Sequence, residues 1–288
     1  MPFDTKFCED ISEIAINSML LEVSATPKPG LVDRNNSGAH KDMDFYTFMK
    51  SSASQVHTFY KCALEGLKFE GKDKRELLKL IRPIGIEGEN KMFKATNGVN
   101  THKGLIFSLG VIAAATGLQY RETQKNMKVE DICHKVTEIA EGIVSRELGN
   151  LKNKEALTYG EKLFKNHGIK GIRGEVESGF PTVRDYSLPL LKELMEGKES
   201  INDNLVQVLL HLMTVVEDVN ILGRHGIEQL EYTKMAAKEA LVLGGIFTEK
   251  GREKILKLDE EFIKKNISPG GAADLLAVTL MLYFLENL

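Results

Sequence analysis

Lys103-Gly104-Leu105-Ile106-Phe107-Ser108-Leu109-Gly110-Val111-Ile112-Ala113-Ala114-Ala115-Thr116-Gly117 overlaps residues 104–118, one of the two longest apolar runs of the chain. The stretch contains no proline, and nearly all of its residues are apolar or small. A helix that is apolar on every side lies in the interior of a protein. The run is shorter than the roughly 18 residues that a membrane-spanning helix needs. The stretch therefore predicts a buried central helix around which the other elements pack.

Helical spacing continues on both sides of this stretch. Apolar residues three and four positions apart mark a helix ending near Ser24, a long helix from Phe45 to Leu67 capped by Asp44, and another from Ile227 to Leu243. No segment alternates with a period of two, and no strand–helix–strand order appears. The sequence therefore predicts an all-α fold, a single compact multi-helix domain over residues 1–288 with its ligand site formed by loops at helix ends.

Prolines and glycines mark the expected breaks between helices. Pro83 ends a short helix that begins at Glu76, and Ser268 caps a last helix whose first position is Pro269. The segment 166–185 holds several glycines and has no clear period. A connection of that length inside a compact domain is typical of a lid or a binding loop.

The composition limits the class of protein. The chain has 288 residues, 42% of them hydrophobic, which is enough to bury a large core. A net charge of -3, from 38 basic and 41 acidic residues, argues against nucleic acid or a membrane as a partner. Cys8, Cys62 and Cys133 lack the spacing of a disulfide framework or a zinc site. Because the N-terminus also shows no signal segment, we expect a cytoplasmic protein.

The stretch from Ala25 to Asp44 is unusual for a connection between two helices. Pro27, Pro29 and Gly30 exclude a helix and impose a stiff, extended path. Charged and polar side chains follow along this path, namely Lys28, Asp33, Arg34, His40 and Asp42. A stiff loop with cations and carboxylates could hold a metal–polyphosphate, although an ordinary polar loop has the same composition.

Two further loops lead into helices. The segment 98–104 enters the central helix, where free backbone N–H groups favour anions. Its candidate residues are Asn100, Thr101, His102, Lys103 and Gly104. The segment 268–274 begins the last helix with Gly270 and Gly271, which let a ligand approach the backbone, and it places Asp274 one turn in. Plain helix capping is the alternative for both loops.

Two more loops combine acids with arginine. The segment 173–184 could close over phosphates through Arg184, and it carries the acid Glu177. The segment 217–226 follows an apolar helix, whose C-terminal end disfavours carboxylates unless a cation lies nearby. Its candidates are Asp218, Asn220 and Arg224. A surface loop is the alternative for the segment 173–184, and a structural ion pair is the alternative for the segment 217–226. The carboxylates, Lys and Arg residues and glycine-rich helix starts that recur in these loops favour a magnesium–polyphosphate ligand over acyl transfer.

These loops resemble the triphosphoribosyl-dephospho-CoA synthase family. Six pieces occur in the family's order and extend over nearly the whole chain. They are Ala25-Thr26-Pro27-Lys28-Pro29-Gly30-Leu31-Val32-Asp33, Asn36-Ser37-Gly38-Ala39-His40-Lys41-Asp42-Met43, Gly98-Val99-Asn100-Thr101-His102-Lys103-Gly104, Glu177-Ser178-Gly179-Phe180-Pro181-Thr182, Glu217-Asp218-Val219-Asn220 and Ser268-Pro269-Gly270-Gly271-Ala272-Ala273-Asp274-Leu275-Leu276-Ala277. His225 stands where the family has a glycine after the arginine, here Arg224. The family's backbone conformation is therefore not carried over to this loop.

The resemblance implies a transferase that moves the 5-triphosphoribosyl group of ATP to the 2'-hydroxyl of 3'-dephospho-CoA and releases adenine. Its product is the precursor of the prosthetic group of citrate lyase, or of malonate decarboxylase in a sister branch, and passes to an acyl carrier protein transferase. Mg²⁺ accompanies ATP. Two alternatives stay open, an Mg-dependent all-α hydrolase of an N-glycosidic or phosphate bond, and a non-catalytic nucleotide-binding module.

This reaction needs three kinds of groups. Cations would hold the retained triphosphate, a carboxylate would stabilise a ribose with oxocarbenium character, and a carboxylate or histidine would accept the hydroxyl proton. The catalytic candidates are Asp33, Asp42, Asp218 and Glu177, and the first three are also the magnesium candidates. The candidates for binding ATP are Lys28, Arg34, His40, Asn100, Thr101, His102, Lys103, Gly104, Arg184, Asn220, Arg224, Gly270, Gly271 and Asp274.

Overall fold

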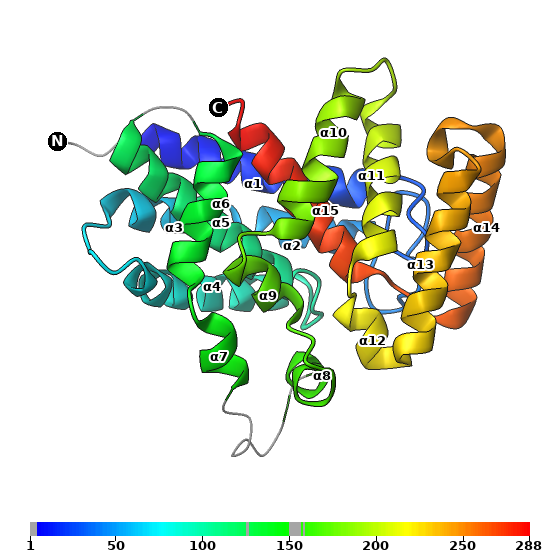
Figure 1. Ribbon diagram of the computed structural model, residues 1–288, viewed down its shortest axis with the longest axis horizontal. Coiled ribbons are helices and arrows are strands. Elements are labelled where there is room, and N and C mark those ends of the chain that lie inside the picture. The colour runs from blue at the N-terminus through cyan, green and yellow to red at the C-terminus, as the bar shows by residue number, and fades with distance from the viewer. Residues whose placement is uncertain (1–4, 125–126, 150–156, 158) are drawn as a thin grey trace.

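The computed structural model describes residues 5–124, 127–149, 157 and 159–288, and every regular element in these ranges is a helix (Figure 1). The all-α prediction is therefore confirmed. The first elements are α1 (Thr5–Ser24), α2 (Phe45–Ala53), α3 (Val56–Lys68), α4 (Arg75–Ala95), α5 (Lys103–Thr123), α6 (Val129–Ala140), α7 (Ile143–Leu148), α8 (Tyr159–His167) and α9 (Gly171–Glu177). The others are η2 (Val183–Ser187), α10 (Leu188–Met195), α11 (Ile201–Val215), α12 (Val219–His225), α13 (Ile227–Val242), η3 (Gly245–Phe247), α14 (Glu249–Lys265) and α15 (Gly270–Leu285).

Helix α5 is the central element, as its composition predicts. Nearly all of its middle residues are buried, and α1, α3, α4, α6 and α15 pack against it. The contact with α3 is close because small residues meet there. A Cβ atom on Gly66 would lie 2.0 Å from the carbonyl oxygen of Ala114, and one on Gly117 would lie 2.1 Å from that of Ala63. Any side chain at either glycine would therefore push the two helices apart.

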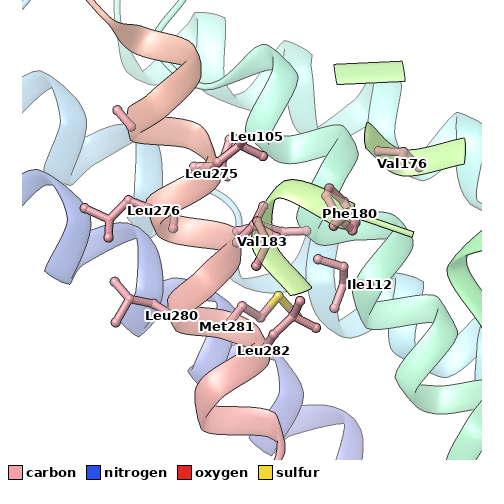
Figure 2. Close-up of a cluster of buried hydrophobic side chains, with 14 of the residues drawn as sticks. Leu105, Ile112, Val176, Phe180, Val183, Leu275, Leu276, Leu280, Met281 and Leu282 are labelled. Atoms are coloured by element: carbon pink, nitrogen blue, oxygen red, sulfur yellow. The ribbon is translucent and has the colours of Figure 1, made fainter. Parts of the chain in front are cut away.

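Helix α15 completes the core. Most residues of the second long apolar run, residues 275–285, are buried, and Tyr283 and Phe284 are partly buried. Figure 2 shows Leu275 and Met281 of α15 in one apolar cluster with Leu105 and Ile112 of α5 and with Val183 of η2. Most of the buried apolar residues from α1 to α15 belong to one connected cluster.

The helix predicted from Phe45 to Leu67 is wrong as a single element. Asp44 caps it as expected, because its side chain accepts from the N–H of Thr47 at 2.8 Å. However, α2 ends at Ala53 and α3 begins at Val56. The Gln55 side chain between them donates to the carbonyl of Gly88 in α4 at 3.1 Å, so a contact with a distant helix fixes the break.

Proline and glycine positions also act differently from the prediction. Pro83 lies inside α4 instead of ending a helix, and it is exposed, so water can replace the lost backbone hydrogen bond. The segment 166–185 is not one long loop, since it contains α9 and η2, which are too short to show a helical period. Ser268 does not cap α15. Its hydroxyl instead lies 2.8 Å from His40 Nε2, and the helix begins at Gly270.

Within the described ranges, no single helix is long and apolar enough to cross a membrane. The pair α11 and α12, bent by 54° at their junction, passes on length and composition alone.

Candidate functional site

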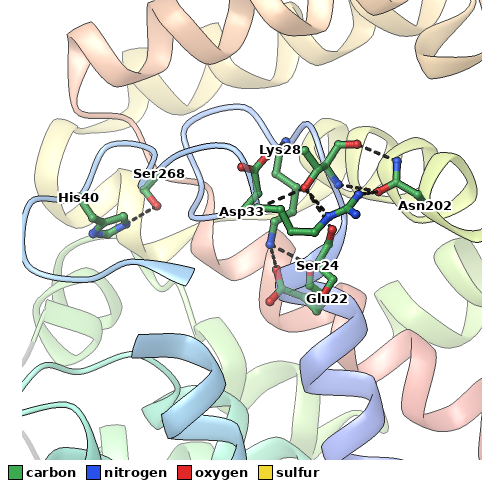
Figure 3. Close-up of polar contacts among 9 residues, drawn as sticks. Glu22, Ser24, Lys28, Asp33, His40, Asn202 and Ser268 are labelled. Carbon is green, nitrogen blue, oxygen red and sulfur yellow. Dashed lines mark hydrogen bonds and ion pairs between the residues drawn. The ribbon is translucent and has the colours of Figure 1, made fainter. Parts of the chain in front are cut away.

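The loop between α1 and α2, residues 25–44, is tied to the C-terminal part of the chain. The N–H of Gly30 donates to Oδ1 of Asp259 in α14 at 2.9 Å, and His40 Nε2 lies 2.8 Å from Ser268 Oγ (Figure 3). Gly30 has a φ of 71°, and a Cβ atom there would lie 2.2 Å from the carbonyl oxygen of Ile267. The loop therefore lies directly against the segment that leads into α15, and only glycine fits at its closest approach.

Lys28 is the most deeply buried cation of this loop, with 1% of its surface exposed. Its Nζ donates to the carbonyl oxygen of Glu22 in the last turn of α1 at 2.9 Å, and also to the Glu22 carboxylate (Figure 3). Burial raises the pKa of Glu22, while the charge of Lys28 acts in the opposite direction. Removing either partner would leave an uncompensated buried charge, so this pair holds the loop on α1.

Asp33 folds the loop around itself. Its two carboxylate oxygens accept from the N–H groups of Lys28 at 3.0 Å, Asn35 at 2.7 Å and Asn36 at 3.1 Å. The side chain is 2% exposed. A carboxylate with three backbone donors has few lone pairs left for a metal or a substrate proton.

Asp218 joins the N-terminal ends of two helices. Its Oδ1 accepts from the N–H groups of Asn220 and Ile221 at the start of α12, at 2.9 and 3.3 Å. Its Oδ2 accepts from those of Gly271 and Ala272 at the start of α15, at 2.7 and 3.2 Å. Burial raises the pKa of Asp218, although these four N–H groups favour its charged form. The N-terminus of α15 is thus already occupied by a carboxylate of the chain itself.

Asp274 lies where α15 meets α5. Its Oδ2 is 3.1 Å from the position that a Cβ atom on Gly104 would take, so the carboxylate stands over the first turn of α5. It is half-buried, and it accepts no hydrogen bond from any described residue. Burial raises the pKa of Asp274 well above its usual value, and the nearby charges of Glu22 and Asp218 add to the effect. An unsatisfied carboxylate with a raised pKa is a stronger base than an ordinary one.

His102 precedes α5 and is 2% exposed. Its Nδ1 lies 2.7 Å from the hydroxyl of Ser51 in α2, and the hydroxyl of Thr101 donates to Ser51 at 2.7 Å. Its buried Nε2 has no hydrogen-bond partner among the described residues. Burial lowers the pKa of His102 to about 3, with a smaller contribution from the charge of Lys28, so the ring is neutral.

The first turn of α5 has free donors. Asn100 Oδ1 accepts from the N–H of Lys103 at 3.1 Å, but the N–H groups of Gly104 and Leu105 meet no acceptor in the described part of the chain. The Lys103 side chain is 55% exposed and pairs with Glu89 at 2.9 Å. An exposed ion pair of this kind is weak, so Lys103 can exchange Glu89 for another anion.

Further predicted residues lie at the edge of this arrangement. Arg34 is exposed and donates to Oδ1 of Asn202 in α11 at 2.9 Å. Arg224 is exposed on α12 and lies close enough to His40 for its charge to act with burial in lowering the pKa of that histidine. Asn220 is exposed beside α15, with its Nδ2 at 2.7 Å from the position of a Cβ atom on Gly270.

Two predicted residues are held elsewhere. Glu177, at the end of α9, accepts from the N–H of Val144 at 3.3 Å and lines a cavity of about 810 Å³ with residues of α6 and of the connection before α4. Arg184 in η2 pairs with the adjacent Asp185 at 2.6 Å. Asp42 is 63% exposed, and its carboxylate is 3.8 Å from Nδ1 of His40.

The predicted magnesium residues do not form a cage. No group of three or more His, Cys, Asp or Glu side chains in the described ranges is arranged to hold a metal ion. Asp33 and Asp218 use their oxygens on backbone N–H groups, while Asp42 keeps open oxygens at the surface. These donors fit a magnesium ion that arrives on a polyphosphate and takes one carboxylate from the chain.

Sequence reasoning missed Glu22 and Ser51, which contact Lys28 and His102. Both lie within helices, where their spacing is that of ordinary helical residues, so the sequence offers no signal for them. Asp259 was also missed, although it accepts from Asn36 Nδ2 at 2.8 Å as well as from Gly30. It lies in α14, far from the loop in sequence.

A family model described as ATP:dephospho-CoA triphosphoribosyl transferase matches residues 8–288. Among similar proteins, a 2-(5''-triphosphoribosyl)-3'-dephosphocoenzyme-A synthase from Escherichia fergusonii is 39% identical over 275 residues, covering 94% of this chain and 89% of the relative.

Two relatives named as probable synthases of the same kind are similarly close. The one from Salmonella gallinarum is 40% identical over 273 residues, covering 95% of this chain and 90% of the relative. The one from Streptococcus mutans is 37% identical over 287 residues, covering 96% of this chain and 97% of the relative.

Proposed function

This chain belongs to the ATP:dephospho-CoA triphosphoribosyl transferase family, and from that premise we propose how its residues carry out the reaction. The chain is an enzyme that transfers the triphosphoribosyl group of ATP to 3'-dephospho-CoA. The alternatives of a hydrolase and of a non-catalytic nucleotide-binding module are not favoured, because the family match extends over residues 8–288.

The reaction exchanges one bond at the ribose of ATP. The bond between C1' and adenine N9 breaks, and the 2'-oxygen of dephospho-CoA bonds to C1'. The hydroxyl proton is lost to a base, and adenine leaves more easily when a ring nitrogen receives a proton or a hydrogen bond. The triphosphate is not transferred alone but serves as a handle whose binding energy positions the ribose.

We propose that the triphosphate lies at the N-terminus of α5. Gly104 and Leu105 present N–H groups without acceptors in the described ranges, and Gly104 has no side chain to obstruct an oxygen. The helix dipole adds a favourable potential for an anion. Lys103 is exposed in a weak pair with Glu89, and we infer that it turns to the phosphates.

Asp274 is the residue that we propose as general base. It stands over the first turn of α5, its oxygens accept no bond from described residues, and its raised pKa makes it a stronger base than an ordinary carboxylate. The position of this carboxylate beside Gly104 is the single observation that carries the proposal. Asp33 and Asp218, which the sequence favours as acids, instead hold the loop and the starts of α12 and α15 in place.

Magnesium enters this proposal as the ion that accompanies ATP. Such an ion keeps several waters and phosphate oxygens and takes one or two carboxylates from the protein. Asp42 is the predicted metal residue with open oxygens, and we infer that it fills this role. When bound, the ion neutralises part of the triphosphate charge.

The product defines the next partner. We infer that 2'-(5''-triphosphoribosyl)-3'-dephospho-CoA passes to an acyl carrier protein transferase that serves citrate lyase, with malonate decarboxylase as the second possibility. Incubating the product with the carrier subunit of each enzyme and the corresponding transferase would distinguish the two, because only the proper carrier gains the mass of the prosthetic group.

The proposed function is tested by the product itself. Incubation with ATP, Mg²⁺ and 3'-dephospho-CoA is expected to give a species whose mass equals the sum of both substrates minus adenine. An acceptor with a 2'-deoxyribose in place of its ribose is expected to give none. A product from the deoxy acceptor, or ribose triphosphate formed with water, would contradict the transfer to the 2'-hydroxyl.

A further inference from the structure

His102 carries a buried ring nitrogen that the described chain leaves unsatisfied. The residue is 2% exposed, and Nε2 meets neither a partner among the described residues nor solvent. The other nitrogen, Nδ1, is engaged with Ser51 at 2.7 Å. Buried polar atoms almost always have partners, so an orphaned one at a ligand site indicates a group that the ligand supplies.

The hydroxyl groups around Nδ1 determine which nitrogen carries the proton. Thr101 donates its hydroxyl proton to Ser51 at 2.7 Å, so Ser51 Oγ already acts as an acceptor. Its own proton has Nδ1 as the acceptor at hydrogen-bond distance. The reverse arrangement would leave the Ser51 proton without a described acceptor. Nδ1 therefore accepts, and the single proton of the neutral ring lies on Nε2.

We propose that Ser51 and Thr101 are positioning residues that hold His102 as its Nε2–H tautomer, so that this N–H donates to an oxygen of the ATP triphosphate. The inference rests on the proposed position of the triphosphate at the N-terminus of α5.

The surroundings of His102 favour an anionic acceptor over a neutral one. His102 lies two residues before Gly104, whose N–H group meets no acceptor in the described ranges, and the charge of Lys28 reaches its ring. Because the ring is neutral, its contribution is a directed N–H and not a charge. The Phe48 ring, whose centroid is 4.8 Å from that of His102 and whose plane is nearly perpendicular to the imidazole, helps hold the imidazole plane.

Ser51→Ala and Ser52→Ala form a matched pair for the test. Both serines are buried in α2, but Ser52 donates to the carbonyl of Phe48 in its own helix, whereas Nδ1 of His102 is bonded to Ser51. We expect Ser51→Ala to raise the Kd for Mg–ATP about tenfold, as the loss of a hydrogen bond to a charged group does. Ser52→Ala should change it less than twofold. Isothermal titration without dephospho-CoA measures both.

Two variants of His102 separate the effect of its Nε2–H donor from the effect of its ring volume. His102→Gln can place an amide N–H near the position of Nε2 and is expected to retain most of the ATP affinity. His102→Phe keeps the ring but has no donor, and it is expected to lose at least as much affinity as Ser51→Ala. Equal losses in the two variants would contradict a donor role.

The tautomer is read directly by NMR of the protein with ¹⁵N-labelled histidine. We expect the His102 signals of the Nε2–H form in the full chain, and a shift toward the other tautomer in Ser51→Ala. An Nδ1–H form in the unmodified chain, or equal ATP affinities of the two serine variants, would overturn the proposal. Neither measurement needs turnover, so a chain that binds ATP as expected but releases no adenine would contradict the proposed function alone.

Discussion

Replacing Asp274 by asparagine is expected to remove activity while making the protein more stable. A residue that only supports the fold cannot produce this combination. The substitution keeps the shape of the side chain, and Asp274 accepts no hydrogen bond from the described residues, so it breaks no contact of the carboxylate. A loss of activity in this variant would therefore reflect the chemical role of the carboxylate over Gly104 and not a change in packing.

The catalytic loss follows from the proposed role as general base. A positioned base typically contributes between about 10² and 10⁴ in rate, and asparagine cannot accept the proton. We therefore expect kcat to fall by at least about a hundredfold at saturating ATP and dephospho-CoA. The Kd for ATP should stay within a few fold, because the N–H groups of α5 are unchanged.

The gain in stability follows from the direction of the pKa shift. Burial and the charges of Glu22 and Asp218 raise the pKa of Asp274 in the folded chain above its unfolded value of about 3.9. Between these two pKa values the folded state binds more protons, so the free energy of unfolding decreases as pH rises. Each tenfold difference in proton affinity contributes about 1.4 kcal/mol above the folded pKa. Asparagine has no charge to bury and avoids this loss.

The assay combines adenine release with urea unfolding at several pH values. Wild-type activity should rise with pH through the pKa of Asp274, and the stability advantage of Asp274→Asn should grow over the same range. Turnover within threefold of wild type would refute the role as base. A variant less stable than wild type at neutral pH would refute the account of the buried carboxylate.

Three further predictions test other parts of the structure. Asp218→Ala removes the acceptor of four N–H groups at the starts of α12 and α15, and it should lower the free energy of unfolding in urea by about 3 kcal/mol. We propose that residues 1–288 form one unit, so unfolding should show a single transition. Two transitions would contradict the single unit, and an unchanged midpoint would contradict the role of Asp218. Gly66→Ala should lower the free energy of unfolding by about 3 kcal/mol because α3 and α5 must separate. Its control, Gly85→Ala in α4, adds a Cβ that would meet nothing within 4 Å and should raise it by about 1 kcal/mol, so equal thermal shifts in both variants would exclude this explanation. Lys103→Ala should raise the Kd for ATP about tenfold with little change in stability, since its pair with Glu89 is exposed, and an unchanged Kd would rule out its contact with phosphate.

The sequence predicts the all-α fold, its buried helices and the positions of its main loops, because these signals are local. The apolar runs of α5 and α15 require burial wherever they lie, and glycines and prolines mark loops whatever their ligands. The boundary between α2 and α3 was not predictable, since the Gln55 side chain that fixes it bonds to Gly88 in another helix. Pro83 was misread because its cost depends on exposure, which the sequence does not reveal.

The ranking of the acids is the part of the site that sequence reasoning could not determine. Asp33 and Asp218 look like ligands because they follow loop residues, yet the same positions suit carboxylates that accept from backbone N–H groups two or three residues ahead. The sequence places Asp274 among the candidates for binding ATP and not among the catalytic acids. We propose it as the base because of its position beside Gly104, which lies 170 residues earlier in the chain and faces it only after α5 and α15 have packed.

The most direct test of the central claim is the dependence of adenine release on the acceptor. With ATP and Mg²⁺ alone, chromatography should show no adenine above the background of a heated sample. Adding 3'-dephospho-CoA should release one adenine for each acceptor consumed. Adenine formed at the same rate without dephospho-CoA would show that water attacks the ribose, and it would contradict a transferase at this site.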